Sequence, residues 1–280
     1  MNKNSIVAES FNKAIEVNFN NYLENHATGK NSEIQIDEDK LIQEVEYKWL
    51  NETIAEIGNI TPKGYINSLG TLEEIVDFFL EIASTSDVGM PDIVIDRLKE
   101  YGLNAADMLF EFVEDSLHSD KEDVKLAATQ AVFAIGCLKC SEYKEKLIGL
   151  LIDCYADEML SEVICAAIAE YGQEILKDLI KAFNEADQEI AKEYLLVCIA
   201  HISKEHPSDE VYFLFKNAFR NMKNVKVIAE VLGDYGDGRA IPLLRGYILK
   251  DLGKIDKDTF NLVRAVIKKL GGEIDDLVQK

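Results

Sequence analysis

The stretch Ile228–Gly236, IAEVLGDYG, decides the fold, because it is one copy of a pattern that recurs along the chain. Its apolar residues Ile228, Leu232 and Tyr235 stand three or four positions apart, a spacing that predicts one buried face of a helix. Gly236 closes the stretch, as expected of the residue that most easily adopts the left-handed conformation of a helix C-cap. We therefore take Gly236 as the register mark of a helical unit.

The same pattern returns about every 34 residues from residue 72 to the C-terminus. The register marks are Gly102, Gly136, Gly172, Ser203, Gly236 and Gly271. Four positions before each mark stand Leu98, Val132, Ile168, Ile199, Leu232 and Ile267, and eight positions before it stand Val94, Ala128, Ile164, Leu195, Ile228 and Val263. A period of this length is typical of solenoids, whose units must stack to bury their apolar faces. The pattern predicts an all-α fold in which each mark closes the second helix of a hairpin.

Residues 1–70 do not follow the repeat, and we expect them to form a helical cap on the array of residues 71–280. The apolar spacing predicts helices over about residues 6–24 and 39–57, with a loop from Ala27 to Asp37 between them. Thr61-Pro62 is the pattern of a helix N-terminus. Trp49 is expected to anchor the core of the cap. Thr71 with Glu74 is a capping box, which predicts the start of the first repeat.

The charge balance limits the classes of partner. The 280 residues include 51 Asp plus Glu against 30 Lys plus Arg, a formal net charge of −21. Nucleic acids and anionic membranes are bound through clustered cations, so this composition argues against both. The charge is expected to serve solubility, or to attract a basic partner.

The remaining composition predicts a cytoplasmic protein. The first residues, MNKNSIVAE, contain no apolar run before an acid, so we expect no signal peptide. No window approaches the roughly 20 apolar residues that a membrane span needs. The five cysteines are odd in number and lack the spacing of a disulfide scaffold, which fits a reducing compartment.

The junction that follows Ile228–Gly236 carries a family resemblance. Residues 228–244 read IAEVLGDYGDGRAIPLL, with Asp237 placed to cap a new helix and Pro242 within its first turn. This stretch resembles the HEAT-like repeats first associated with phycobilisome lyases, with their Leu-Gly-x-x-Gly-Asp and Arg-Ala-Ile-Pro-x-Leu pattern. The other junctions lack the Asp and the Pro. The resemblance implies a right-handed α-solenoid, a superhelix of about six HEAT-like hairpins.

No catalytic or metal site is predicted. Cys137-x-x-Cys140 and Cys198-x-x-His201 together imitate the spacing of zinc ligands. They lie two repeats apart, however, and packed helices are about 8–10 Å apart, whereas zinc ligands lie at about 2.0–2.3 Å from the ion. Cys198 also falls on the inward face, where a free cysteine acts as a small hydrophobe. We expect no metal, no cofactor and no enzymatic activity.

One set of side chains remains as a candidate partner-binding surface. Its members stand ten, six and two positions before their register marks, on the edge of the second helices away from the buried face. They are Glu162, Ala166, Glu170, Glu193, Val197, His201, Glu230 and Asp234, which we call the stripe. In HEAT-type stacks the second helices line the concave face, so the resemblance implies an acidic groove. The alternative is that these acids only occupy the solvated face of an acidic protein.

The function expected from the repeat and the stripe is that of a non-catalytic scaffold or adaptor that binds another protein. Acidic stripe residues suit a basic peptide or helix, with charge for steering and apolar contact for affinity. The resemblance leaves an alternative, a cofactor-attachment factor of the bilin-lyase type. Bilin propionates require cations, however, and the stripe offers few. A third possibility, a HEAT-like DNA glycosylase, would require a basic groove, whereas Arg97 and Arg264 stand at opposite ends of the array.

Overall fold

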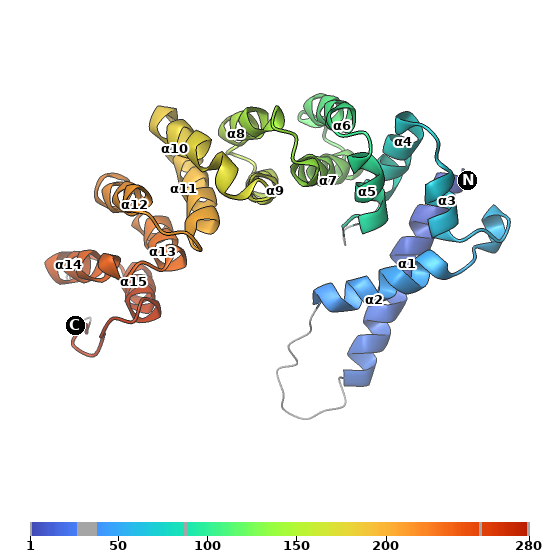
Figure 1. Cartoon of the computed structure of the whole chain (residues 1–280). Coiled ribbons are helices and arrows are strands. Elements are labelled where there is room, and N and C mark those ends of the chain that lie inside the picture. The colour runs from blue at the N-terminus through green and yellow to red at the C-terminus, as the bar shows by residue number, and fades with distance from the viewer. Residues whose placement is uncertain (1, 27–37, 87–88, 252–253, 279–280) are drawn as a thin grey trace. The chain divides into compact units, whose positions relative to one another are not determined.

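The computed structural model describes residues 2–26, 38–86, 89–251 and 254–278, and in these ranges the fold is helical (Figure 1). An isolated bridge between Ile54 and Ile60 is the only β pairing of the described residues. The α-helices up to residue 140 are α1 (Lys3–His26), α2 (Glu38–Asn51), α3 (Pro62–Ser68), α4 (Leu72–Ala83), α5 (Asp92–Lys99), α6 (Leu103–Ser116) and α7 (Glu122–Leu138). Those after it are α8 (Tyr143–Asp153), α9 (Glu158–Ala169), α10 (Leu176–Glu185), α11 (Glu189–Ser203), α12 (Asp209–Asn221), α13 (Val225–Tyr235), α14 (Ile241–Asp251) and α15 (Lys257–Lys269). The all-α prediction is confirmed.

The chain divides into two compact units, residues 1–140 and residues 141–280. Each unit has its own apolar core. The proposed boundary between a cap and a repeat array, at residues 70 and 71, remains a prediction.

In the first unit, α1 packs against α2 and α4. Trp49 of α2 is buried, and its ring lies 4.9 Å from that of Phe11. Its indole Nε1 donates a hydrogen bond to Ser10 Oγ at 2.9 Å. The prediction that Trp49 anchors a core is therefore confirmed.

The start signals predicted in this unit are also present. Thr61 Oγ1 accepts from the backbone N–H of Gly64 at 3.0 Å, with Pro62 as the first residue of α3. Thr71 and Glu74 form the reciprocal capping box of α4: Thr71 Oγ1 accepts from Glu74 N, and Glu74 Oε2 accepts from Thr71 N. Local side-chain chemistry thus sets both helix starts.

One predicted helix was too long. The helix expected over residues 39–57 ends at Asn51, and a 3-10 turn, η1 (Ala55–Ile57), follows it. The physical reason is a tight turn: Ile54 N donates to Ile60 O at 3.0 Å, and Gly58 and Asn59 both have positive φ. The helix expected over residues 6–24 extends over Lys3–His26, and the loop expected from Ala27 to Asp37 lies outside the described residues.

The second unit consists of helical hairpins in two rows (Figure 1). The first helices of the hairpins are α8, α10, α12 and α14. The second helices are α9, α11, α13 and α15, and each packs against the next in that order. At Gly233 of α13 an added Cβ would lie 3.0 Å from Val266 Cγ1, so glycine permits the close approach of α15.

The predicted inward positions are buried in both units. Every residue four or eight positions before a register mark is at most 6% exposed. The register marks coincide less completely with the ends of helices. Gly102, Gly172, Gly236 and Gly271 have positive φ, whereas Gly136 lies inside α7. The prediction that Gly136 closes its helix was wrong: the apolar face continues to half-buried Leu138, and Lys139 takes the left-handed conformation instead, with φ 53°.

Candidate functional site

The stripe occupies one side of three second helices that follow one another in their row, α9, α11 and α13. Glu162 and Ala166 lie on α9 with Glu170 at its C-cap, Glu193, Val197 and His201 lie on α11, and Glu230 and Asp234 lie on α13. Because α11 packs against both α9 and α13, equivalent positions on the three helices share a side. All eight are exposed except Glu170 and Glu193, which are half-buried. The prediction that these positions are exposed is therefore confirmed for six of them, but not for Glu170 and Glu193.

Four stripe residues meet in a cavity of about 500 Å³ between α11, α13 and α15. Its lining consists of Val197, Ala200, His201, Lys204, Val227, Glu230, Val231, Asp234 and Lys269. Val197 is 43% exposed and is an apolar side chain open to solvent at this point. The cavity therefore combines an apolar surface from valines and alanine with a rim of charged groups.

The charge of this rim is mixed rather than purely acidic. Lys269 Nζ forms an ion pair with Asp234 Oδ1, so that carboxylate is already engaged by its own chain. Lys204 adds a second exposed ammonium group. Glu230 is exposed and has no hydrogen-bond or ion-pair partner among the described residues. The carboxylate of the cavity that can take a cation from outside is thus Glu230.

Glu193 of α11 is held by the neighbouring helix. Its Oε2 accepts a hydrogen bond from Asn224 Nδ2 at 2.9 Å, just before α13 begins. Burial raises the pKa of its carboxyl, and the nearby charge of Glu189 raises it further, while the bond from Asn224 lowers it. Glu193 therefore contributes to the packing of α11 on α13 more than to an open charged surface.

Glu162 lies on a shallow, open part of the surface at the start of α9, together with Ala156, Asp157, Glu158 and Met159. Met159 is 51% exposed there, whereas the Asp157 carboxylate is occupied with capping α9 through Leu160 N at 3.0 Å. Glu162 has no hydrogen-bond or ion-pair partner in the described part of the chain. It repeats, two hairpins before Glu230, the combination of an open carboxylate and an exposed apolar side chain.

Several residues that line the α11–α13–α15 cavity do not belong to the predicted stripe. Ala200, Lys204, Val227 and Val231 stand three before, one after, nine before and five before their marks. A cavity wall between two helices is lined by positions adjacent to the stripe as well as by the stripe itself. Helical spacing alone could have suggested Val227 and Ala200, but not the gap beside them, in which Val227 is half-buried and Ala200 stays buried.

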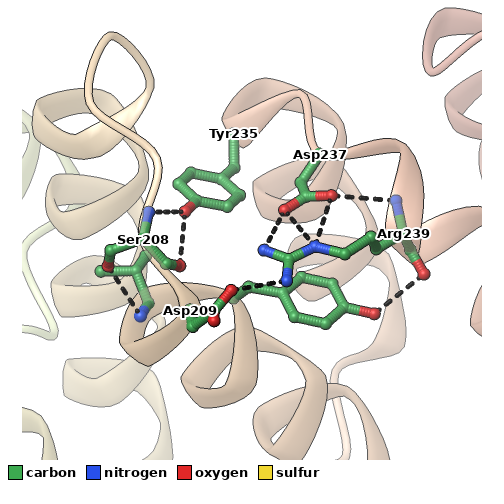
Figure 2. Close-up of polar contacts among 7 residues, drawn as sticks. Ser208, Asp209, Tyr235, Asp237 and Arg239 are labelled. Carbon is green, nitrogen blue, oxygen red and sulfur yellow. Dashed lines mark hydrogen bonds and ion pairs between the residues drawn. The ribbon is translucent and has the colours of Figure 1, made fainter.

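The junction within residues 228–244, which carries the HEAT-like pattern, holds neighbouring helices together through side-chain contacts (Figure 2). Asp237 Oδ1 accepts from Arg239 N at 2.9 Å, which confirms its predicted capping role, and the Arg239 guanidinium reaches Asp209 at 2.6 Å. The guanidinium also lies 4.2 Å from the centre of the Tyr212 ring. Tyr235 Oη accepts from Ser208 N at 2.8 Å and donates to Ser208 O at 3.0 Å. These contacts join the start of α12 to the end of α13, so the motif has a packing role.

The described cysteine thiols do not form an obvious reactive centre. A hydrogen bond to Cys165 and burial both raise the pKa of the Cys198 thiol, and burial raises that of Cys154. Raised thiol pKa values disfavour the nucleophilic thiolate. In the residues that the structure describes, no three His, Cys, Asp or Glu side chains gather as a metal-binding group would require.

None of the described helices is both long and apolar enough to cross a bilayer. Comparison with models of protein families, with curated proteins and with solved structures gave no match to this chain. The HEAT-like resemblance of residues 228–244 therefore stays a prediction from the sequence.

Proposed function

We propose that this protein is a non-catalytic scaffold of the cytoplasm that binds another protein along the exposed edge of α9, α11 and α13. In this proposal the hairpins belong to a right-handed HEAT-like solenoid of about six units, and the stripe lies on its concave face. The packing of each second helix on the next supports the proposal, because equivalent side chains of helices stacked in order would form one row.

The observation that carries the proposal is the pairing of Val197 with Glu230 at the cavity. An exposed valine beside an open carboxylate offers apolar contact and a charge to the same ligand segment. A Lys or Arg of the partner would meet Glu230, and an apolar side chain of the partner would cover Val197. Glu162 with Met159 would receive a second such pair.

The partner expected from these groups is a basic, partly apolar peptide or helix. The ammonium groups of Lys204 and Lys269 at the same cavity limit the orientation in which such a segment fits. Charges of both signs on one rim act chiefly on specificity and association rate, whereas buried apolar contact supplies most of the affinity.

The test is a capture from lysate of the cells that express the protein, with three forms as bait. These are the wild type, the double variant Glu162→Lys/Glu230→Lys, and the control Glu145→Lys/Glu185→Lys. All four glutamates are exposed, and those of the control lie on α8 and α10, so both variants change the net charge equally. We expect a protein that the wild type and the control retain and the stripe variant loses. Equal capture by all three forms would contradict the proposal.

A further inference from the structure

A second groove, of about 700 Å³, lies between α10 and α12, in the row of first helices. Helix α10 packs on α11 and α12 packs on α13, but α10 and α12 do not pack closely on each other. The gap between them is lined by the apolar side chains Ile180, Phe183, Phe213, Leu214, Ala218 and Met222. None of these residues belongs to the stripe.

The apolar surface of this groove is open to solvent. Phe213 is 50% exposed, and Ile180, Phe183, Leu214 and Met222 are half-buried. Isolated exposed apolar residues are common, but several that converge in one groove mark a binding surface. Covering them with a partner side chain would remove apolar area from water, which is favourable.

The lining positions follow one face of α12 over three turns. Glu210, Phe213, Leu214, Asn217, Ala218 and Asn221 are spaced as i, i+3, i+4, i+7, i+8 and i+11. At a rise of 1.5 Å per residue this face is about 16 Å long. The groove therefore has the length of a three-turn helix.

Each end of the groove carries a carboxylate. Glu210 lies in the first turn of α12. Asp187 lies at the opposite end, two residues before Glu189, whose carboxylate forms an ion pair with Lys223 beyond the end of α12. Glu210 and Asp187 are exposed and have no hydrogen-bond or ion-pair partner within the described ranges. The remaining lining cation, Lys192, lies 5.7 Å from the centre of the Phe183 ring. The groove thus presents an unpaired carboxylate at each end of an apolar floor.

We infer that this groove docks an amphipathic helix of a partner protein, with large apolar residues at i, i+3 or i+4 and i+7 and a Lys or Arg near each end. Helix-in-groove recognition uses this spacing of anchors. A second copy of this chain fits less well, since two chains of net charge −21 repel and would bring carboxylates together. The inference is independent of the stripe, because no stripe residue lines this groove.

The test uses a display library of helical peptides, selected on the full-length protein and then measured by fluorescence anisotropy. Enriched peptides are expected to carry the apolar spacing with basic ends. Their Kd should rise at least ten-fold in Phe213→Ser and in Asn217→Arg, which fills the groove from an exposed position. It should rise several-fold in Asp187→Asn/Glu210→Gln, with a weaker salt dependence than in the wild type.

Two controls separate this inference from the proposed function. Leu249→Ser removes an equally exposed apolar side chain from α14, and Glu162→Lys/Glu230→Lys alters the stripe. Both should leave the Kd of the selected peptides unchanged. The inference is overturned by no enrichment, by peptides that bind Phe213→Ser and Asn217→Arg like the wild type, or by peptides with acidic ends. A dimer in sedimentation that Phe213→Ser dissociates would overturn it too, because a second copy would then be the occupant.

Discussion

Ile168 and Ala166 stand two positions apart on α9 and face opposite environments. Ile168 is fully buried among the inward positions of the repeat, whereas Ala166 belongs to the stripe and is exposed. The repeat predicts both environments, because only one face of each second helix can pack on its neighbours.

A carboxylate introduced at these two positions should therefore have very different effects. Ile168→Asp buries an unpartnered charge and is expected to cost at least about 3 kcal/mol of unfolding free energy. Ala166→Asp should lower Tm by less than about 2 °C, because exposed substitutions cost little. Melting curves of the two variants by circular dichroism provide the measurement. Similar curves for both would mean that the face assignment is incorrect.

Glu46 is a buried acid that no spacing or motif in the sequence marks. It lies on α2, is 9% exposed, and accepts a hydrogen bond from the backbone N–H of Asp92 at 3.0 Å. The pKa of its carboxyl is raised to about 7, mainly by burial and also by the charges of Asp92 and Asp96, against the lowering effect of the backbone hydrogen bonds.

This raised pKa predicts a pH-dependent stability of the first unit. Because the folded pKa exceeds the unfolded value of 4.5, the contribution of Glu46 is fully present below pH 4.5 and is lost as the pH rises through about 7. The loss amounts to at most about 3 kcal/mol. Glu46→Gln should abolish it. Denaturant unfolding followed by the fluorescence of Trp49, the chain's single tryptophan, reports on this unit. Identical stability changes between pH 5 and pH 8 in both proteins would contradict the prediction.

The partners of individual stripe residues could not be predicted from the sequence. The pattern identified the exposed positions, but Asp234 is engaged by Lys269 and Glu193 by Asn224, each from a different stretch of chain. Such pairings depend on the distance and rotation between neighbouring helices, which periodicity does not specify. Whether the stripe is a binding surface or only a solvated face thus depends on Glu162 and Glu230, the exposed stripe carboxylates without a hydrogen-bond or ion-pair partner among the described residues.

At the scale of elements, the junction between α13 and α14 combines a helix cap with an ion pair on one residue. Asp237 accepts from the backbone N–H of Arg239 and also from its guanidinium, and the guanidinium hydrogen bonds lower the pKa of the Asp237 carboxyl. A 3-10 turn, η3 (Gly238–Ala240), leads from this cap into α14, with Pro242 in the first turn as predicted.

Two substitutions separate these contributions. Asp237→Ala removes both and should destabilise the second unit by about 1 kcal/mol or more, the usual cost of a lost N-cap. Asp237→Asn retains a capping oxygen and loses only the charge, so it should cost clearly less, because an ion pair whose guanidinium is open to solvent contributes little. Urea unfolding of the three proteins gives the free energies. A larger loss for Asn than for Ala would contradict this division of roles.

Helix interiors were easier to predict than helix ends. Burial followed the repeat at every inward position, whereas α2 and α7 end elsewhere than expected. Interiors are determined by a summed pattern over several turns. An end depends on one or two residues, such as the positive φ of Gly58 or of Lys139, and a single competing turn shifts it.

At the scale of the whole molecule, the net charge of −21 should make stability depend on salt. Between about 0.01 M and 0.15 M salt the Debye length falls from about 30 Å to about 8 Å, which screens repulsion among unpaired acids. The same salt weakens the exposed ion pairs, but each contributes at most about 1 kcal/mol. We expect Tm to rise with salt at pH 8. A fall in Tm over this range would show that the ion pairs dominate.

The cavities were beyond prediction from the sequence. The repeat predicts which faces are buried, but a gap such as that between α10 and α12 arises from how far neighbouring hairpins separate. Phe213, the most exposed apolar side chain of that gap, differs from a core phenylalanine only through this spacing.

Hydrogen–deuterium exchange of the full-length protein, with and without its captured partner, tests most directly whether the stripe binds that partner. We expect the partner to slow exchange in the segments 158–170, 189–203 and 225–235, and Glu162→Lys/Glu230→Lys to remove that protection. Protection confined to other segments, or protection in these segments that the double variant keeps, would contradict the claim that the stripe binds a partner.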